Sequence, residues 1–350
     1  MKNLVKITLA VILVLMCVNL QAKEEKNSKQ EKSKIVSQKR LKGQRIVSPW
    51  FVGNGCSIEQ LLPNADIIGS LSLFCTPSEE FIRYCHEHNI ETYLAVSGGA
   101  DVFSTAKQRQ NTIKEYLSYC SGPAGVDGID LDLEHLDTKY KDTYSIFLRE
   151  VSAALHKAGK KLAICVGYYP PMYKDKLVFW YDPKVIGRTC DMVRVMCYDM
   201  YYAPGKGNEE LMDRGDCQGI GPTSTSPWAR EAMQFWLRYV PSEKLIMGLP
   251  AYSNDYDLAP NGKGTQVEAP RPNSSVAKVF DKTWLPYEQI NMYRYLDDQG
   301  HLHIFYASDT KSTVAHLETV DDLNIGGISF WYYQAVPDET WTAVCKWLKD

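Results

Sequence analysis

The stretch 125-GVDGIDLDLEH-135 contains four carboxylates among apolar residues of the kind that form a buried strand. Side chains alternate between the two faces of a strand, so Asp130, Asp132 and Glu134 share one face. The opposite face is apolar and consists of Ile129, Leu131 and Leu133. We therefore expect the apolar face to pack against a layer of helices, and the three acids, called here the acid row, to point to the other side.

Burying the acid row is costly, because carboxylates that leave water must share protons or accept hydrogen bonds. Successive acids on one strand face stand roughly 6.5–7 Å apart, so at least one pKa in the row should be raised. Glu134 lies nearest the strand end, and we expect it to hold a proton and donate it. Asp127 has the opposite parity, which indicates a structural role at the strand start. His135 falls on the apolar side, as a packing or supporting residue.

Seven further segments have the composition of strands, because they are rich in β-branched or aromatic residues and end near Gly, Pro or Ser. These segments are residues 45–51, 65–74, 91–99, 161–170, 192–202, 244–253 and 326–334. Together with residues 126–135, they give eight predicted strands. Helical apolar spacing predicts helices at residues 78–89, 105–120, 141–159, 228–240 and 338–350. This alternation favours parallel βαβ units and a single α/β domain, a (β/α)8 TIM barrel. A doubly wound open sheet is the alternative, but Gly53-Asn54-Gly55 does not supply the GxGxxG phosphate loop.

One interval interrupts the alternation between the seventh and eighth predicted strands. Residues 254–303 contain many turn residues and two strand-like pieces, INMYRYLDD and HIFYAS. They predict a short insertion, too small to form a second domain.

The N-terminal residues differ in composition from the rest of the chain. Residues 1–22 combine a basic start, an apolar run and a small residue at Ala22, which is typical of a cleaved secretory signal. A lipoprotein signal that acylates Cys17 is the alternative. Residues 23–44 are charged and nearly free of apolar residues, which predicts a flexible linker before a catalytic domain at 45–350. We expect the mature protein to be secreted, periplasmic or bound to the cell envelope.

Composition limits the possible partners. The net charge of −3 argues against a nucleic-acid surface, which needs concentrated Lys and Arg. No apolar run after the signal is long enough to span a membrane. The ten cysteines become nine after signal cleavage, which is too few for a disulfide-built scaffold, and their pairing stays open. Cys165 and Cys197 lie in apolar strands, as small hydrophobic residues. No spacing of Cys and His predicts a zinc site, and we expect a monomer without a cofactor.

Polar and aromatic residues also follow the other predicted strands. In a barrel, functional residues gather at the carboxyl ends of the strands. The motifs at these ends are Ser97-Gly98-Gly99, Tyr168-Tyr169, Tyr198-Asp199 and Trp331. They should therefore share one mouth with the acid row.

The acid row by itself is also compatible with a Mg²⁺ or Mn²⁺ site, or with a purely structural cluster of acids. A calcium loop likewise spaces acids by two, but it needs Gly at its sixth position and polar residues between the ligands. Leu131 and Leu133 in the intervening positions indicate a strand instead.

Residues 127-DGIDLDLE-134 resemble the DxxDxDxE signature of the family-18 glycoside hydrolases, the chitinase-type family. Four further motifs resemble those of the family in chain order, at predicted strand ends. They are Ser97-Gly98-Gly99, Met196-Cys197-Tyr198-Asp199, Gly248-Leu249-Pro250-Ala251-Tyr252 and Trp331. The resemblance extends from about residue 45 to residue 345.

The resemblance implies a substrate-assisted mechanism, in which the acetamido oxygen of the substrate is the nucleophile and the anomeric configuration is retained. Glu134 would protonate the glycosidic oxygen, and Asp132 would accept the acetamido N–H. Asp130 would share a proton with Asp132, and Tyr198 would donate its hydroxyl to the acetamido oxygen. The implied substrate-binding residues are Asp199 at sugar hydroxyls, Trp331 as the floor under the sugar, Met196, Tyr252, and Ser97, which shapes the interior around Asp130.

The expected function is therefore that of an exported, retaining hydrolase of β-1,4-linked N-acetylglucosamine glycans, chitin or chito-oligosaccharides. The same chemistry on peptidoglycan or on the chitobiose core of N-glycans is an alternative. A catalytically silent lectin is another, although such lectins typically lose an acid that is present here. The short insertion predicts a shallow groove, which argues against processive degradation, and Trp50 and Phe51 are left open as subsite residues.

Overall fold

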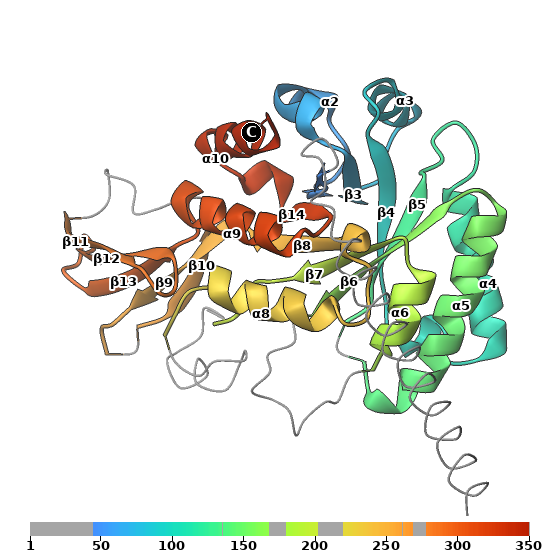
Figure 1. The fold of residues 1–350 in the computed structure, drawn as a ribbon. Coiled ribbons are helices and arrows are strands. Elements are labelled where there is room, and N and C mark those ends of the chain that lie inside the picture. The colour runs from blue at the N-terminus through green and yellow to red at the C-terminus, as the bar shows by residue number, and fades with distance from the viewer. Residues whose placement is uncertain are drawn as a thin grey trace, which may run out of the picture. The chain divides into compact units, whose positions relative to one another are not determined.

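The computed structural model describes residues 45–134, 136–167, 180–201, 220–260, 262–268 and 278–349, all within one compact unit, Lys42–Asp350. Figure 1 shows the arrangement of its helices and strands. The predictions for residues 1–44, His135, Tyr168 and Tyr169 lie outside the described residues.

Parallel strands form the centre of the described unit (Figure 1). Their order in the sheet is β1-β14-β8-β7-β6-β5-β4-β3-β2, so neighbours in space follow one another along the chain. The strands are β1 (Ile46–Val47), β2 (Trp50–Val52), β3 (Ser70–Phe74), β4 (Glu91–Ser97), β5 (Gly128–Asp132), β6 (Lys161–Gly167), β7 (Met192–Met196), β8 (Leu245–Pro250) and β14 (Gly327–Trp331).

The first predicted strand closes this sheet into a barrel. It is interrupted at Ser48 and Pro49, and its two pieces pair on opposite sides, β1 with β14 and β2 with β3. Ser48 N donates to Ile328 O at 2.8 Å, whereas Val47 O accepts from Gly69 N at 2.9 Å. Pro49 has no N–H to give to either neighbour, which accounts for the break. The predicted (β/α)8 barrel is confirmed.

Helices connect most of the barrel strands and lie on the outer side of the sheet (Figure 1). They are α2 (Ile58–Leu61), α3 (Glu79–Glu87), α4 (Ala106–Tyr119), α5 (Lys141–Lys157), α6 (Pro183–Thr189), α8 (Ser226–Trp236), α9 (Thr310–Leu323) and α10 (Asp338–Lys349). Short 3₁₀ helices are η2 (Leu62–Ile67), η3 (Ala100–Val102), η4 (Thr138–Tyr140), η6 (Ser242–Lys244) and η7 (Tyr333–Ala335).

Local sequence explains where several of these helices begin and end. Thr105 and Gln108 form a capping box at the start of α4, which satisfies backbone donors that have no helical partner. Gly159 follows α5 with φ +71°, as its predicted place after the helix requires. The second predicted strand began too early, because Leu62–Ile67 is a 3₁₀ helix with Pro63 in its first turn, where proline is favourable.

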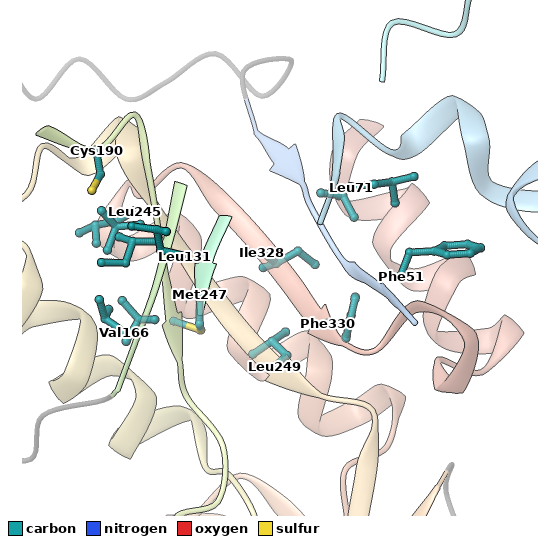
Figure 2. Packing of buried hydrophobic residues seen from close by; sticks show 14 of the residues in the cluster. Phe51, Leu71, Leu131, Val166, Cys190, Leu245, Met247, Leu249, Ile328 and Phe330 are labelled. Atoms are coloured by element: carbon teal, nitrogen blue, oxygen red, sulfur yellow. The ribbon is translucent and has the colours of Figure 1, made fainter. Parts of the chain in front are cut away.

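The core lies between the strands and the helices, and β5 contributes to it as its alternation predicts. Ile129, Leu131 and Leu133 are each at most 3% exposed and belong to the largest apolar cluster, together with Phe147 and Leu148 of α5. Figure 2 shows other members of this cluster on β2, β3, β6, β8 and β14. Burying a leucine side chain contributes about 1.5–3 kcal/mol, so the apolar face offsets part of the cost of the acids behind it.

A second sheet, antiparallel, lies between β8 and β14 in the chain, drawn in orange in Figure 1. Its order is β10-β9-β13-β12-β11. The strands are β9 (Tyr252–Asp257), β10 (Gly264–Glu268), β11 (Lys278–Leu285), β12 (Ile290–Leu296) and β13 (Leu302–Ala307).

The sequence predicted two strand-like pieces in this interval, whereas the structure has five strands. The seventh predicted strand is also divided, because β8 ends at Pro250 and β9 begins at Tyr252. β9 and β10 contain Asn, Asp and Gly, which are poor strand formers. They are strands because they pair with each other and β9 also pairs with β13.

The described cysteines include one disulfide. Cys56 and Cys75 join the segments that follow β2 and β3, with Cα atoms 5.9 Å apart. Cys165 and Cys197 are buried and free, in agreement with their predicted packing role. In the described part of the chain, no helix is long and apolar enough to cross a membrane.

Candidate active site

The carboxyl ends of the barrel strands bring the predicted site residues to one level. Ser97, the last residue of β4, pairs in register with Asp132 of β5. On the other side of the barrel, Met196 of β7 pairs with Gly248, and Trp331 of β14 pairs with Pro250. Because neighbouring parallel strands end together, these residues surround the same mouth.

The acid row runs from the barrel interior to this mouth. Asp130 is fully buried, Asp132 is half-buried and Glu134 is exposed. The deepest acid has partners of its own: Ser72 Oγ donates to Asp130 Oδ2 at 2.5 Å, and Arg194 Nη1 lies 2.8 Å from the same oxygen. Arg194 is not among the site residues predicted from the sequence, because no local pattern links it to Asp130.

Asp132 is the member of the row whose protonation the structure changes most. Burial, followed by the charges of Glu134 and Asp130, raises the pKa of Asp132 to about 8. A hydrogen bond with Glu134 acts in the same direction, and one with Cys165 opposes it. Asp132 Oδ1 is buried without a hydrogen-bond partner.

The middle of the row therefore holds a proton at neutral pH. The sequence analysis expected a raised pKa in the row and assigned the proton to Glu134. The structure gives the raised pKa to Asp132, which is hydrogen-bonded to Glu134. The buried proton is therefore placed on Asp132, within hydrogen-bonding reach of Glu134.

Aromatic residues support the mouth next to the acid row. Trp331 is half-buried and packs on Trp50 with ring centroids 5.8 Å apart, and on Phe74 at 5.4 Å. Trp50 is 1% exposed and Phe51 is 0% exposed, so neither contacts solvent or a substrate directly. Of Trp331, Trp50 and Phe51, Trp331 is thus the residue whose ring can present a surface to a sugar ring.

Tyr198 lies against the same aromatic group and keeps its hydroxyl proton at neutral pH. Its ring centroid is 6.2 Å from that of Trp50 and 6.3 Å from that of Tyr252. Burial holds the pKa of Tyr198 well above its usual value of 10. Its hydroxyl therefore keeps its proton and can donate a hydrogen bond.

Asp199 follows Tyr198 in a left-handed conformation, with φ 58°. Tyr252 donates its hydroxyl to Asp199 Oδ1 at 2.6 Å, and Gln266 Nε2 donates to the same oxygen at 2.8 Å. Burial is the main cause that raises the pKa of Asp199, and the charge of Glu134 adds to it. Asp199 is thus held beside Glu134 by residues of the second sheet.

Gln266 of β10 was missed by the sequence analysis, and no signal in the sequence points to it. It is an exposed polar residue in a strand that only its pairing with β9 reveals. Its side chain extends the mouth of the barrel onto the second sheet.

The remaining predicted residues have supporting positions. Ser97 is exposed, and a Cβ at Gly98 would stand 3.1 Å from Val102 Cγ1, so a side chain there would require Val102 to shift. Met196 is half-buried and packs on Trp50 and Tyr198. In the described ranges, no group of three or more His, Cys, Asp or Glu could hold a metal ion, so the alternative of a Mg²⁺ or Mn²⁺ site gains no support from them.

The chain is similar in sequence to proteins that are named as a glycosylase and as a lytic enzyme. The chain is 24% identical over 302 residues to the "Uncharacterized glycosylase YvbX" of Bacillus subtilis, covering 82% of this chain and 81% of the relative. It is 26% identical over 218 residues to the "Cortical fragment-lytic enzyme" of Bacillus subtilis, covering 59% of this chain and 46% of that relative.

The fold is similar to that of a chitinase from Chromobacterium violaceum, with a TM-score of 0.72 and 18% sequence identity over 87% of this chain and 99% of the other. The family model "Glycosyl hydrolases family 18" matches residues 65–335, which include the barrel strands from β3 to β14 and the whole acid row. This match covers most of the chain. The protein therefore belongs to glycosyl hydrolase family 18 and is a glycosidase.

Proposed function

We propose that this glycosidase is an exported, retaining hydrolase of β-1,4-linked N-acetylglucosamine glycans, chitin or chito-oligosaccharides, and that it acts by substrate-assisted catalysis. The observation that carries the proposal is the Asp132–Glu134 pair, in which Asp132 holds a proton and is hydrogen-bonded to Glu134, beside the donor Tyr198. A general acid must hold a proton at working pH, and this pair keeps one at neutral pH.

In the first step, Glu134 donates its proton to the glycosidic oxygen, and the bond from that oxygen to C1 breaks. The acetamido carbonyl oxygen of the same sugar attacks C1, so the bond that forms closes a cyclic oxazolinium. Asp132 accepts the acetamido N–H, and Tyr198 donates its hydroxyl to the acetamido oxygen, which holds the nucleophile under C1. Water then attacks C1, and the bond between C1 and the acetamido oxygen breaks. Glu134 takes the proton of the water, and the anomeric configuration is retained.

The proton on Asp132 can reach Glu134 when the substrate binds. In the free enzyme, burial keeps Asp132 protonated and hydrogen-bonded to Glu134. When the acetamido N–H replaces Glu134 as its partner, Asp132 is stabilised as an anion and its proton passes to Glu134. The proton is then next to the leaving oxygen, and the negative charge is next to the oxazolinium nitrogen.

The substrate class follows from the same groups. An acceptor at Asp132 and a donor at Tyr198 match an acetamido group, and the half-buried Trp331 offers an apolar face for the sugar ring. The similarity of the fold to that of the chitinase from Chromobacterium violaceum favours chitin-type chains as the substrate. Peptidoglycan is the second candidate, because the sequence also matches the cortical fragment-lytic enzyme of Bacillus subtilis.

A substrate panel tests the proposal. The wild-type protein is incubated with an N-acetylglucosamine hexamer, with muropeptides and with a high-mannose glycopeptide, and Glu134→Gln serves as the inactive control. We expect cleavage of the hexamer with β-anomeric products visible by NMR at early times. Cleavage of muropeptides alone would select the second candidate, and inverted products would exclude the mechanism. Binding of the hexamer without turnover would identify a lectin.

Export and a monomeric state are part of the proposal. The charged residues 23–44 and the signal-like residues 1–22 support export, and the Cys56–Cys75 disulfide suits an oxidising compartment. We expect mass spectrometry of the mature protein to give an N-terminus at Lys23. A lipid-modified Cys17 in the membrane fraction would contradict this and favour the lipoprotein. Sedimentation of the protein at the mass of one chain would support the monomer, and a heavier species would exclude it.

A further inference from the structure

Arg194 carries a full positive charge into the interior of the barrel. It lies in the middle of β7 and its side chain is 0% exposed. Its neighbours Val193 and Val195 belong to the cluster that packs against the helices, so Arg194 points to the inside, on the same side of β7 as Met196. Because solvent does not reach the guanidinium, its positive charge must be compensated by groups within the barrel.

The contacts of Arg194 lead to the deepest acid of the row. Its Nη1 is 2.8 Å from Asp130 Oδ2, and its Nη2 donates to Ser48 Oγ at 2.7 Å. The carbon of the guanidinium lies 5.4 Å from the centre of the Tyr93 ring. Nε and Nη1 have no hydrogen bond in addition, so the ion pair with Asp130 is the main compensation of the charge.

This ion pair determines which acid can hold a proton. A guanidinium does not lose its proton in a protein, and a buried cation without an anion is very unfavourable. Asp130 is the carboxylate within ion-pairing distance of Arg194 among the described residues. Asp130 must therefore stay an anion, and Ser72, which donates to the same oxygen, supports that charge.

We propose that Arg194 is a positioning residue of the hydrolysis: by holding Asp130 as an anion, it directs the proton of the acid row to Asp132, next to Glu134. The inference rests on the proposed function and changes the role that the resemblance implied for Asp130. Asp130 acts as a fixed negative charge beside Asp132, instead of as a partner that takes the proton from it. That charge is one of the causes that keep Asp132 protonated.

The variant Arg194→Met tests the proposal through the pH dependence of kcat/KM on the N-acetylglucosamine hexamer. Loss of the cation leaves Asp130 buried and unpaired, so the row takes up a second proton. We expect the acidic limb of the profile to move up by about one pH unit or more, because Asp130 becomes easier to protonate once its cation is removed. We also expect kcat to fall about tenfold near neutral pH, with KM changed less.

Two controls separate charge from packing. Arg194→Lys keeps a cation beside Asp130, and we expect it to return the acidic limb toward its wild-type position. In an Asp130→Asn background, adding Arg194→Met should not move the acidic limb further, because the charge through which Arg194 acts is already gone. If Arg194→Met does not fold, Ser48→Ala, which removes one hydrogen bond of the guanidinium, should shift the limb in the same direction by a smaller amount.

The outcomes are distinguishable from failure of the proposed function. If the wild-type protein cleaves no N-acetylated glycan, the proposed function is wrong and the inference falls with it. If the wild-type protein is active and Arg194→Met retains its pH profile and kcat, the inference alone is overturned. An equal shift in Arg194→Lys and Arg194→Met would also overturn it. If Arg194→Met does not fold, a Ser48→Ala profile like that of the wild type would overturn it instead.

Discussion

Strand β5 has an aspartate at each end, and the two lie in opposite environments. Asp127, just before the strand, accepts hydrogen bonds from Thr92 N at 2.9 Å, Thr92 Oγ1 at 3.0 Å and His86 Nε2 at 3.0 Å. Asp132, the last residue of the strand, has a buried oxygen without a partner and two other acids beside it. Asp127 is thus surrounded by hydrogen-bond donors, whereas Asp132 is surrounded by like charges.

The arrangement at the amino end occurs again two strands further along. Asp191, just before β7, accepts from Leu162 N at 2.8 Å and from His156 Nε2 at 2.8 Å. In both cases the histidine comes from the helix before the neighbouring strand, six residues ahead of the residue whose N–H is bound. This repetition indicates that the amino ends of the strands are built for stability.

The difference between the two ends shows how one residue type serves both stability and chemistry. Donors at Asp127 satisfy its carboxylate oxygens, so this side chain contributes to the fold. Like charges and burial at Asp132 make the anion unfavourable, so it keeps a proton that can move. Substitutions at the two ends should therefore have opposite effects on activity and on stability.

Glu134→Gln should give the largest effect, because it removes the acid at the mouth without changing its size. We expect kcat/KM on the N-acetylglucosamine hexamer to fall by about 10²–10⁴-fold, the usual contribution of a general acid. Binding of the hexamer, measured by calorimetry, should persist. Activity within a few-fold of the wild type would contradict the assigned role.

Asp132→Asn should lower activity by about 100-fold and make the fold more stable at neutral pH, because it removes an unfavourable buried acid. The usual pKa of this carboxyl is 3.8, and the folded value is raised to about 8. Between these values the folded chain holds a proton that the unfolded chain has lost. Wild-type stability should therefore be highest below about pH 4 as far as Asp132 is concerned, and should fall as pH rises toward 8.

Thermal unfolding of the wild type and of Asp132→Asn across this pH range measures the effect. The gap in Tm should widen from pH 4 to pH 8 in favour of the variant, by on the order of 2–4 °C for each kcal/mol gained. A constant gap would show that Asp132 does not carry the buried proton.

Asp127→Ala should have the reverse effect, since it removes an acceptor that three donors use. We expect a loss of about 1–3 kcal/mol in the free energy of unfolding, because the buried Thr92 donors lose their partner. The value of kcat should stay within about twofold, given that surface-end hydrogen bonds do not reach the chemistry. Asp191→Ala is the matched control at the amino end of β7, and a large loss of kcat in either variant would break the comparison.

Gln266→Ala should give the smallest effect. Its amide supports Asp199 together with Tyr252 and Thr223, so two donors to Asp199 Oδ1 remain. We expect a change of about two- to fivefold, mainly in KM, as for the loss of one exposed hydrogen bond. An effect as large as that of Asp132→Asn would place Gln266 in direct contact with the reacting sugar.

The barrel and the identity of the acid row could be predicted from the sequence, because both depend on short-range alternation. Period two along residues 128–134 separates Ile129, Leu131 and Leu133 from the acids, and the order of strands and helices predicts the parallel closure. The site motifs at Tyr198, Tyr252 and Trp331 follow, since parallel strands end on the same side. His86 is exposed on α3 and its ring reaches Asp127, a contact that no local pattern predicts.

Only the tertiary structure decided how the charges are compensated. Arg194 and Asp130 lie on strands that are distant in the sequence, and Gln266 reaches Asp199 from a sheet whose strands carry little local signal. The burial that raises the pKa of Asp132 is likewise a property of the closed barrel and not of the strand. The sequence by itself determined which acids share a face, because side-chain alternation is local. Which of them keeps the proton depends on burial and on charges brought from other strands, and these exist only after folding.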